Sequence, residues 1–231
     1  MRLRLLLVCA ISCLASVWFA PAALAFGDCG DAAYMQTFDD RLRAGSCDVI
    51  GVVDIRWSGG SAHMRLIKEH SSTIGSAAAL MEQVRELAGR VGSAMDQIGG
   101  LSIPDVTVLL TDLMPPARED AHADIQRTPK LERECAVAFY KSRTGMSRDQ
   151  FVFTYAHELF HCIQFKMFLA KMVGHSDNWW TEGTAEYFAY LARPGYSGDD
   201  SFISQFDAES DAQSLHTMEY ETIAFFAWCS A

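Results

Sequence analysis

The stretch from Asp149 to about Val173 constrains the fold more than any other part of this 231-residue chain. Apolar side chains occur on nearly every side of the helix that this stretch would form. They are Phe151, Val152, Phe153, Tyr155, Leu159, Phe160, Ile163, Phe165, Phe168 and Leu169. A helix that is apolar all round is typical of a protein interior. The sequence therefore predicts a buried central helix around which the other elements pack.

Strands are predicted upstream of this helix and further helices beyond it. Runs of β-branched and apolar residues predict strands at 49–57, 63–68, 104–111 and 133–141. Helices are predicted at 31–44, 73–98, 180–192 and 218–228, and an acidic loop at 196–214. Strands followed by helices favour an α+β fold, with a small mixed or antiparallel sheet before the buried helix and the helix at 180–192.

The first 25 residues read as a secretory signal peptide. Arg2 and Arg4 precede an apolar run over 5–19, and small residues at Ala23 and Ala25 suit cleavage after Ala25. An uncleaved signal anchor is the alternative. With cleavage, residues 26–231 form a single domain that is secreted or periplasmic and has no stable membrane association.

The net charge and the cysteine content indicate which partners and which compartment to expect. The net charge of −10 becomes −12 once the two arginines of the signal segment are removed. This acidic balance argues against nucleic acid and against anionic membrane surfaces as partners. The cysteines that remain are Cys29, Cys47, Cys135, Cys162 and Cys229. A Cys29–Cys47 bridge is favoured, Cys162 is interpreted as a buried thiol, and the other pairings stay open.

The buried helix contains the sequence His157-Glu158-Leu159-Phe160-His161. Four residues of helix correspond to about 400° of rotation, so both histidines project from one face, one turn apart. Two imidazole nitrogens placed in this way can bind one zinc ion. Glu158 lies about 100° round the helix, where its carboxylate can contact a water beside the metal. The pattern therefore predicts a metal site on this helix.

The segment Trp179-Trp180-Thr181-Glu182-Gly183-Thr184-Ala185-Glu186-Tyr187 follows downstream. Together with the H-E-x-x-H pattern it resembles the gluzincin metallopeptidases, and the resemblance covers roughly residues 149–192. It implies a zincin-like fold in which Glu182 is the third zinc ligand. It also implies that Glu186, one helical turn on, accepts a hydrogen bond from a zinc-binding histidine. The alternative, in which Glu186 is the ligand and Glu182 its helper, stays open.

The resemblance implies an exported zinc-dependent peptidase that hydrolyses peptides or proteins with a zinc-activated water and Glu158 as general base. Tyr220 is the candidate hydrogen-bond donor to the developing oxyanion, with His216 as the weaker candidate on the same predicted helical face. The strand at 133–141 is a candidate substrate-binding edge or an ordinary sheet strand. The alternative function is a non-catalytic secreted protein that keeps a degenerate or truncated zincin fold. Cleavage specificity and oligomeric state stay open.

Overall fold

The computed structural model describes residues 26–73, 76–113, 121–124, 134–140, 147–168, 178–196 and 199–230. The predicted signal segment, residues 1–25, lies outside this range and stays a prediction. The strands are β1 (Cys47–Trp57), β2 (Gly60–Glu69), β3 (Asp105–Thr111), β4 (Ala121–Asp124) and β5 (Glu134–Tyr140). The helices are α1 (Ala32–Met35), α2 (Ala77–Ile98), α3 (Arg148–Met167), α4 (Asn178–Ala192), α5 (Asp199–Glu209) and α6 (Ile223–Cys229), with short 3₁₀ turns η2 (Leu215–Thr217) and η3 (Tyr220–Thr222).

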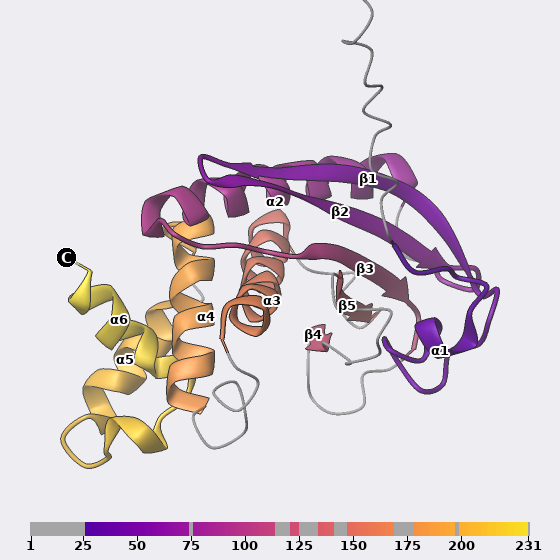
Figure 1. Cartoon of the computed structure of the whole chain (residues 1–231). Helices are drawn as coiled ribbons and strands as arrows, with labels where there is room; N and C mark the ends of the chain where they lie inside the picture. The colour runs from indigo at the N-terminus through magenta and orange to yellow at the C-terminus, as the bar shows by residue number, and fades with distance from the viewer. Residues whose placement is uncertain are drawn as a thin grey trace, which may run out of the picture.

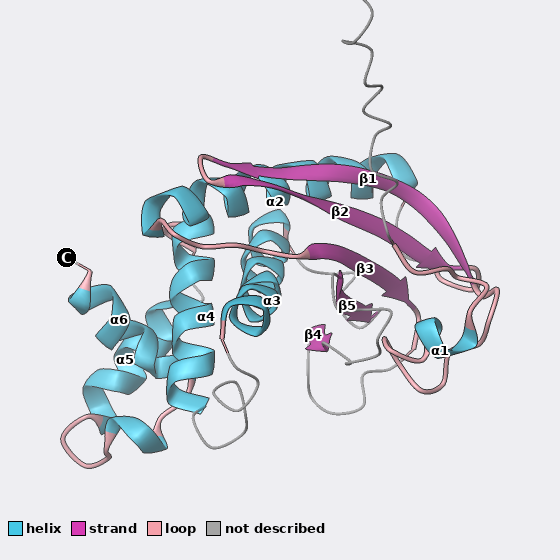
Figure 2. Cartoon of the chain, in the orientation of Figure 1, coloured by secondary structure: helices cyan, strands magenta, loops and turns pink. Residues whose placement is uncertain are grey.

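The strands form one mixed sheet in the order β1-β2-β3-β5-β4. Strands β2, β3 and β5 are parallel, whereas β1 and β4 run antiparallel at the two edges. The strands of the described residues precede helices α3 to α6 along the chain. Figure 2 distinguishes these strands from the helices by colour. The predicted α+β class with a small mixed sheet is confirmed for the described residues.

Both faces of the sheet are covered. Helices α2 and α3 pack on one face, and α4 packs against both of these helices (Figure 1). On this face, Val106, Val108, Val137 and Phe139 belong to one core with the apolar side chains of α3. On the opposite face, α1 and the turns after it cover Leu109 and neighbouring residues of β5. Strands that are buried on both faces consist almost entirely of apolar residues. Strands β3 and β5 are of this kind, and their apolar runs are the pattern that predicts them from the sequence. The apolar core on the first face fixes the position of α3 on the sheet.

Three sequence predictions fail in detail. The predicted helix at 31–44 is only the single turn α1, because i to i+3 hydrogen bonds follow it and the carboxylate of Asp39 accepts the backbone N–H of Arg41 at 2.9 Å. The predicted acidic loop at 196–214 contains α5, in which Phe202 and Phe206 share a half-buried face. The predicted helix at 218–228 is broken into η3 and α6.

The substrate-edge interpretation of residues 133–141 is also wrong. Strand β5 lies inside the sheet between β3 and β4, so the edge beside α3 belongs to β4. The prediction missed β4 because its four residues, Ala-His-Ala-Asp, lie in a polar stretch and carry no apolar pattern.

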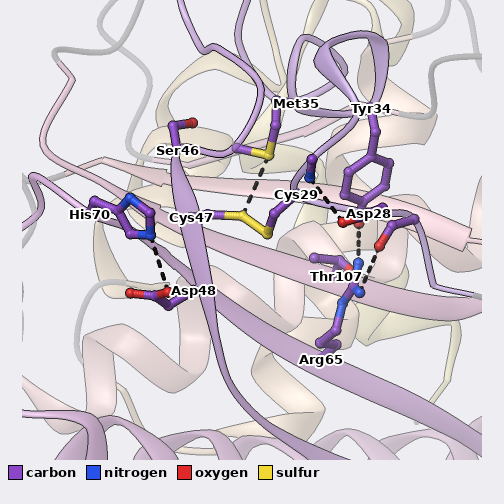
Figure 3. Close-up of a disulfide and its surroundings, with 12 residues drawn as sticks. Asp28, Cys29, Tyr34, Met35, Ser46, Cys47, Asp48, Arg65, His70 and Thr107 are labelled. Carbon is purple, nitrogen blue, oxygen red and sulfur yellow. Dashed lines mark hydrogen bonds and ion pairs between the residues drawn. A yellow bond between two sulfur atoms is a disulfide. The ribbon is translucent and has the colours of Figure 1, made fainter.

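Two disulfides fasten the structure. The predicted Cys29–Cys47 bridge is confirmed and ties the start of the described chain to β1, beside Met35 (Figure 3). The second bridge joins Cys135 on β5 to Cys162 on α3, so Cys162 is buried as predicted, but its sulfur forms a disulfide and is not a thiol. The sequence could not show this pairing, because only the packing of α3 over β5 brings the two residues together. Cys229 is the free, exposed cysteine of the described residues.

A second set of contacts holds the N-terminal segment on the far face of the sheet. The Arg65 guanidinium donates to the carbonyl oxygen of Gly27 at 2.8 Å and lies close to the buried Glu134 carboxylate. Tyr34 joins the same cluster, and its hydroxyl donates to Glu134 at 2.7 Å. Residues 26–48 therefore cover the face of the sheet opposite to α3. Within the residues that the structure describes, no helix combines the length and apolar character of a membrane span.

Candidate metal centre

Helix α3 is positioned by its first turn and by its contact with α4. The Ser147 hydroxyl caps the helix by accepting the backbone N–H of Gln150 at 3.1 Å. Asp149 in the first turn makes a two-pronged ion pair with Arg193, just beyond the end of α4, with both contacts at 2.7 Å. The start of α3 is thereby tied to the end of α4, and the two helices lie side by side in Figure 1.

The two helices bring His157, His161 and Glu182 together. The Nε2 atom of His157 lies 3.1 Å from Nε2 of His161 and 3.2 Å from Oε2 of Glu182, and Nε2 of His161 lies 3.6 Å from the same carboxylate oxygen. Zinc bonds of about 2.0–2.1 Å in tetrahedral geometry place ligand atoms about 3.3 Å apart. The three separations fit this spacing, and the three residues form a group able to hold a metal ion.

The other ring nitrogens are already engaged. The Nδ1 atom of His157 donates to the Glu186 carboxylate at 2.7 Å, and Nδ1 of His161 donates to Oε1 of Gln164 at 2.8 Å. Donation from Nδ1 leaves Nε2 of a neutral imidazole as an acceptor. Two such Nε2 lone pairs facing each other at 3.1 Å repel unless a cation or a proton lies between them. The arrangement is therefore suited to a cation.

The contacts of these residues also shift their pKa values. Burial lowers the pKa of His157, but hydrogen bonds to Glu182 and Glu186 outweigh it, so the pKa is raised well above its usual value. Burial raises the pKa of Glu182, but hydrogen bonds to His157 and His161 reverse this and leave it strongly lowered. The two shifts favour a protonated His157 beside an ionised Glu182, whose Nε2 and Oε2 atoms lie 3.2 Å apart.

Glu158 is buried on α3 and directly follows His157. Its negative charge contributes to raising the pKa values of Tyr155 and Tyr220, after the larger effect of burial. Both tyrosines consequently keep their hydroxyl protons at neutral pH. The Tyr155 hydroxyl is fully buried and has no hydrogen-bond partner among the described residues.

Of the two candidate oxyanion donors, Tyr220 is the one near the histidines. Its ring centroid lies 5.8 Å from that of His157, and the same ring stacks on Phe202 with centroids 5.6 Å apart. His216 packs edge-on against Trp179 instead. The expected common helical face is wrong, because His216 and Tyr220 belong to separate 3₁₀ turns with the extended Met218 between them.

Gly183 allows η3 to cross α4 beside Glu182. A Cβ atom at position 183 would overlap the hydroxyl oxygen of Thr222 and would lie 2.9 Å from the ring of Phe226. The buried Thr222 hydroxyl donates to the carbonyl oxygen of Trp179 at 2.6 Å. This close crossing fixes the turn that carries Tyr220.

Sequence reasoning missed Gln164, which contacts His161 directly. The available signal was a polar side chain within an otherwise apolar helix, one turn beyond a metal-ligand candidate. Buried polar groups nearly always have hydrogen-bond partners, so such a residue predicts a specific contact. Gly183 carried a weaker signal, as a glycine inside a helix.

Comparisons with known proteins give structural neighbours only. No family model matches the chain, and no curated protein matches it. Among solved structures, the M1 zinc metallopeptidase from Deinococcus radiodurans is similar over 77% of this chain and 36% of its own, with 18% identity and a TM-score of 0.42. A mutant of it bound to a Tyr-Ser-Ala substrate gives 16% identity and a TM-score of 0.45 over the same shares. The chain thus spans about a third of the length of these structures, and TM-scores of this size do not by themselves establish a shared fold.

Proposed function

We propose that this chain is an exported, zinc-dependent peptidase with a zincin-like domain. The observation that carries the proposal is the convergence of His157 Nε2, His161 Nε2 and a Glu182 oxygen at separations suited to tetrahedral zinc. Two histidines and one carboxylate form a ligand set that catalytic zinc uses, with a fourth position left for water.

Zinc held by these three residues would lower the pKa of a water to about 7 and polarise a carbonyl group. The Glu158 carboxylate accepts a proton from water as the water oxygen attacks the carbonyl carbon of a peptide bond. The same carboxyl group then gives that proton to the leaving amine nitrogen. The Tyr220 hydroxyl donates a hydrogen bond to the carbonyl oxygen as negative charge develops on it. Glu186 holds the His157 ring in place from its Nδ1 side.

The location of Glu158 supports an enzyme over a non-catalytic protein with a degenerate site. A purely structural zinc site needs a closed set of four ligands and no general base. Here the described residues supply three ligand candidates, and the buried Glu158 directly follows one of them, His157, whose pKa its charge helps to raise. The expected substrates are peptides or proteins outside the cytoplasm.

An extracytoplasmic location is part of the same proposal. The Cys29–Cys47 and Cys135–Cys162 bridges suit an oxidising compartment. The signal-like segment over residues 1–25 agrees with export, followed by cleavage after Ala25.

The test of the mechanism is the Glu158→Gln variant, which keeps the shape of the side chain and removes the base. We expect one zinc per chain, as in the wild type, and a loss of peptide hydrolysis of about 10²–10⁴-fold. The matched control is Glu82→Gln on the exposed surface of α2, for which zinc content and hydrolysis should be unchanged. Normal hydrolysis by the Glu158 variant would show that this carboxylate is not the base.

A further inference from the structure

Gln164 joins a metal-ligand candidate to the helix that carries the third one. Its side chain is completely buried on α3, one turn after His161. The amide oxygen accepts the Nδ1–H of His161 at 2.8 Å. The amide nitrogen donates to the carbonyl oxygen of Thr181 and to the hydroxyl oxygen of Thr184, both at 2.8 Å. Each end of this amide therefore has a defined partner.

The backbone of α4 determines which way the amide points. The carbonyl oxygen of Thr181 can only accept a hydrogen bond, so it must face the NH₂ group of Gln164. The Thr184 hydroxyl donates to the carbonyl oxygen of Trp180 at 2.6 Å, which leaves its oxygen to accept the second amide hydrogen. Both N–H groups are thus turned toward α4. The amide oxygen has only the His161 side left.

The orientation of the amide in turn determines the tautomer of His161. An oxygen facing Nδ1 requires the ring proton to be on Nδ1. The Nε2 lone pair then points toward His157 and Glu182, where the three ligand atoms converge. The chain of contacts runs from two backbone carbonyls of α4, through Thr184 and Gln164, to the metal-facing nitrogen of His161.

From this geometry we propose that Gln164 is a positioning residue for the zinc site, which it serves by holding His161 in the Nδ1–H tautomer. The inference rests on the proposed zinc site. Because its carbonyl partner, Thr181, directly precedes Glu182, the same amide also ties His161 to the backbone beside the third ligand. Partners of this kind affect metal affinity about 10–100-fold, so we expect a loss of that size when the contact is removed.

The test compares three variants of the full exported protein. Gln164→Met has a similar size and makes none of the three hydrogen bonds. Gln164→Glu keeps an acceptor for His161 but cannot donate to Thr181. The matched control, Lys166→Met, removes a different side-chain contact of α3, the 2.7 Å hydrogen bond to the carbonyl oxygen of Ile103. The zinc dissociation constant is measured by chelator competition, and circular dichroism of each metal-free protein establishes that it is folded.

We expect zinc affinity to fall about 10–100-fold in Gln164→Met, to recover most of that loss in Gln164→Glu, and to stay at the wild-type value in Lys166→Met. Long-range ¹H–¹⁵N spectra of the imidazoles in the zinc-free proteins should report the Nδ1–H tautomer of His161 in the wild type and the Glu variant, and a mixture in the Met variant. A folded Met variant that binds zinc as the wild type does would overturn the inference and leave the proposed zinc site standing. A Glu variant in which His161 is a mixture of tautomers would also overturn it. Wild-type protein that binds no zinc would overturn the proposed function and this inference together.

Discussion

Replacing Gly183 by alanine has two effects of opposite sign on the stability of the folded protein. In a helix interior, alanine is favoured over glycine by about 1 kcal/mol, so propensity alone predicts stabilisation. At this position, however, the new methyl group would overlap the Thr222 hydroxyl and press on Phe226. Overpacking of this kind costs about 1–3 kcal/mol, and loss of the hydrogen bond from Thr222 to Trp179 costs about 1 kcal/mol more. We therefore expect net destabilisation of about 1–3 kcal/mol.

The assay is urea unfolding of the metal-free protein, followed by circular dichroism, with thermal unfolding as a second measurement. The midpoint temperature should fall roughly 2–4 °C for each kcal/mol. Gly89→Ala on α2 is the matched control, because a Cβ atom there meets nothing within 4 Å. This control should gain up to about 1 kcal/mol.

A double-mutant cycle with Thr222→Ala tests the cause. Removing the hydroxyl relieves the overlap, so the double variant should be less destabilised than the sum of the single variants by about 1 kcal/mol or more. Catalytic turnover should fall in Gly183→Ala, because the displaced turn carries Tyr220 away from His157. A Gly183→Ala protein as stable as the wild type would refute the reasoning.

Three further predictions concern the pH dependence of zinc affinity, the pH dependence of stability, and the second disulfide. The raised pKa of His157 means that zinc must displace a proton from this residue, so apparent zinc affinity should rise about tenfold per pH unit below that pKa, measured by chelator competition between pH 5.5 and 8. The raised pKa of His157 also stabilises the zinc-free protein below about pH 6.5, which is the pKa of histidine in the unfolded chain. This contribution to stability is lost as the pH rises through the pKa of His157 in the folded protein. Replacing Cys135 and Cys162 together by alanine opens a loop with a sequence separation of 27 and should cost about 3–4 kcal/mol in urea unfolding, whereas an unchanged midpoint would show that packing alone holds α3 on β5.

The parts of the fold that were predictable from sequence are those set by local patterns. Helix α3 and strands β3 and β5 can each be predicted from the apolar residues of their own segment. The i, i+4 spacing of His157 and His161 likewise places both rings on one helix face before any tertiary structure is known.

The parts that were not predictable depend on contacts between distant segments. Strand β4 is recognisable only through its pairing with β5, and the Cys135–Cys162 bridge only through the packing of α3 on the sheet. The proximity of Tyr220 to His157 depends on the absence of a side chain at Gly183. The partners of Gln164 come from α4, so its role could not be read from α3 alone.

The central claim is that His157, His161 and Glu182 hold one zinc ion, and metal analysis of the purified protein tests it most directly. Wild-type protein, Glu182→Ala and the surface control Glu82→Ala are dialysed against the same limiting zinc buffer and analysed by mass spectrometry for metal per chain. We expect one zinc per chain in the wild type and in Glu82→Ala, and little or none in Glu182→Ala. A folded wild-type protein without zinc, or a Glu182→Ala variant that retains it fully, would show that these three residues do not form a zinc site.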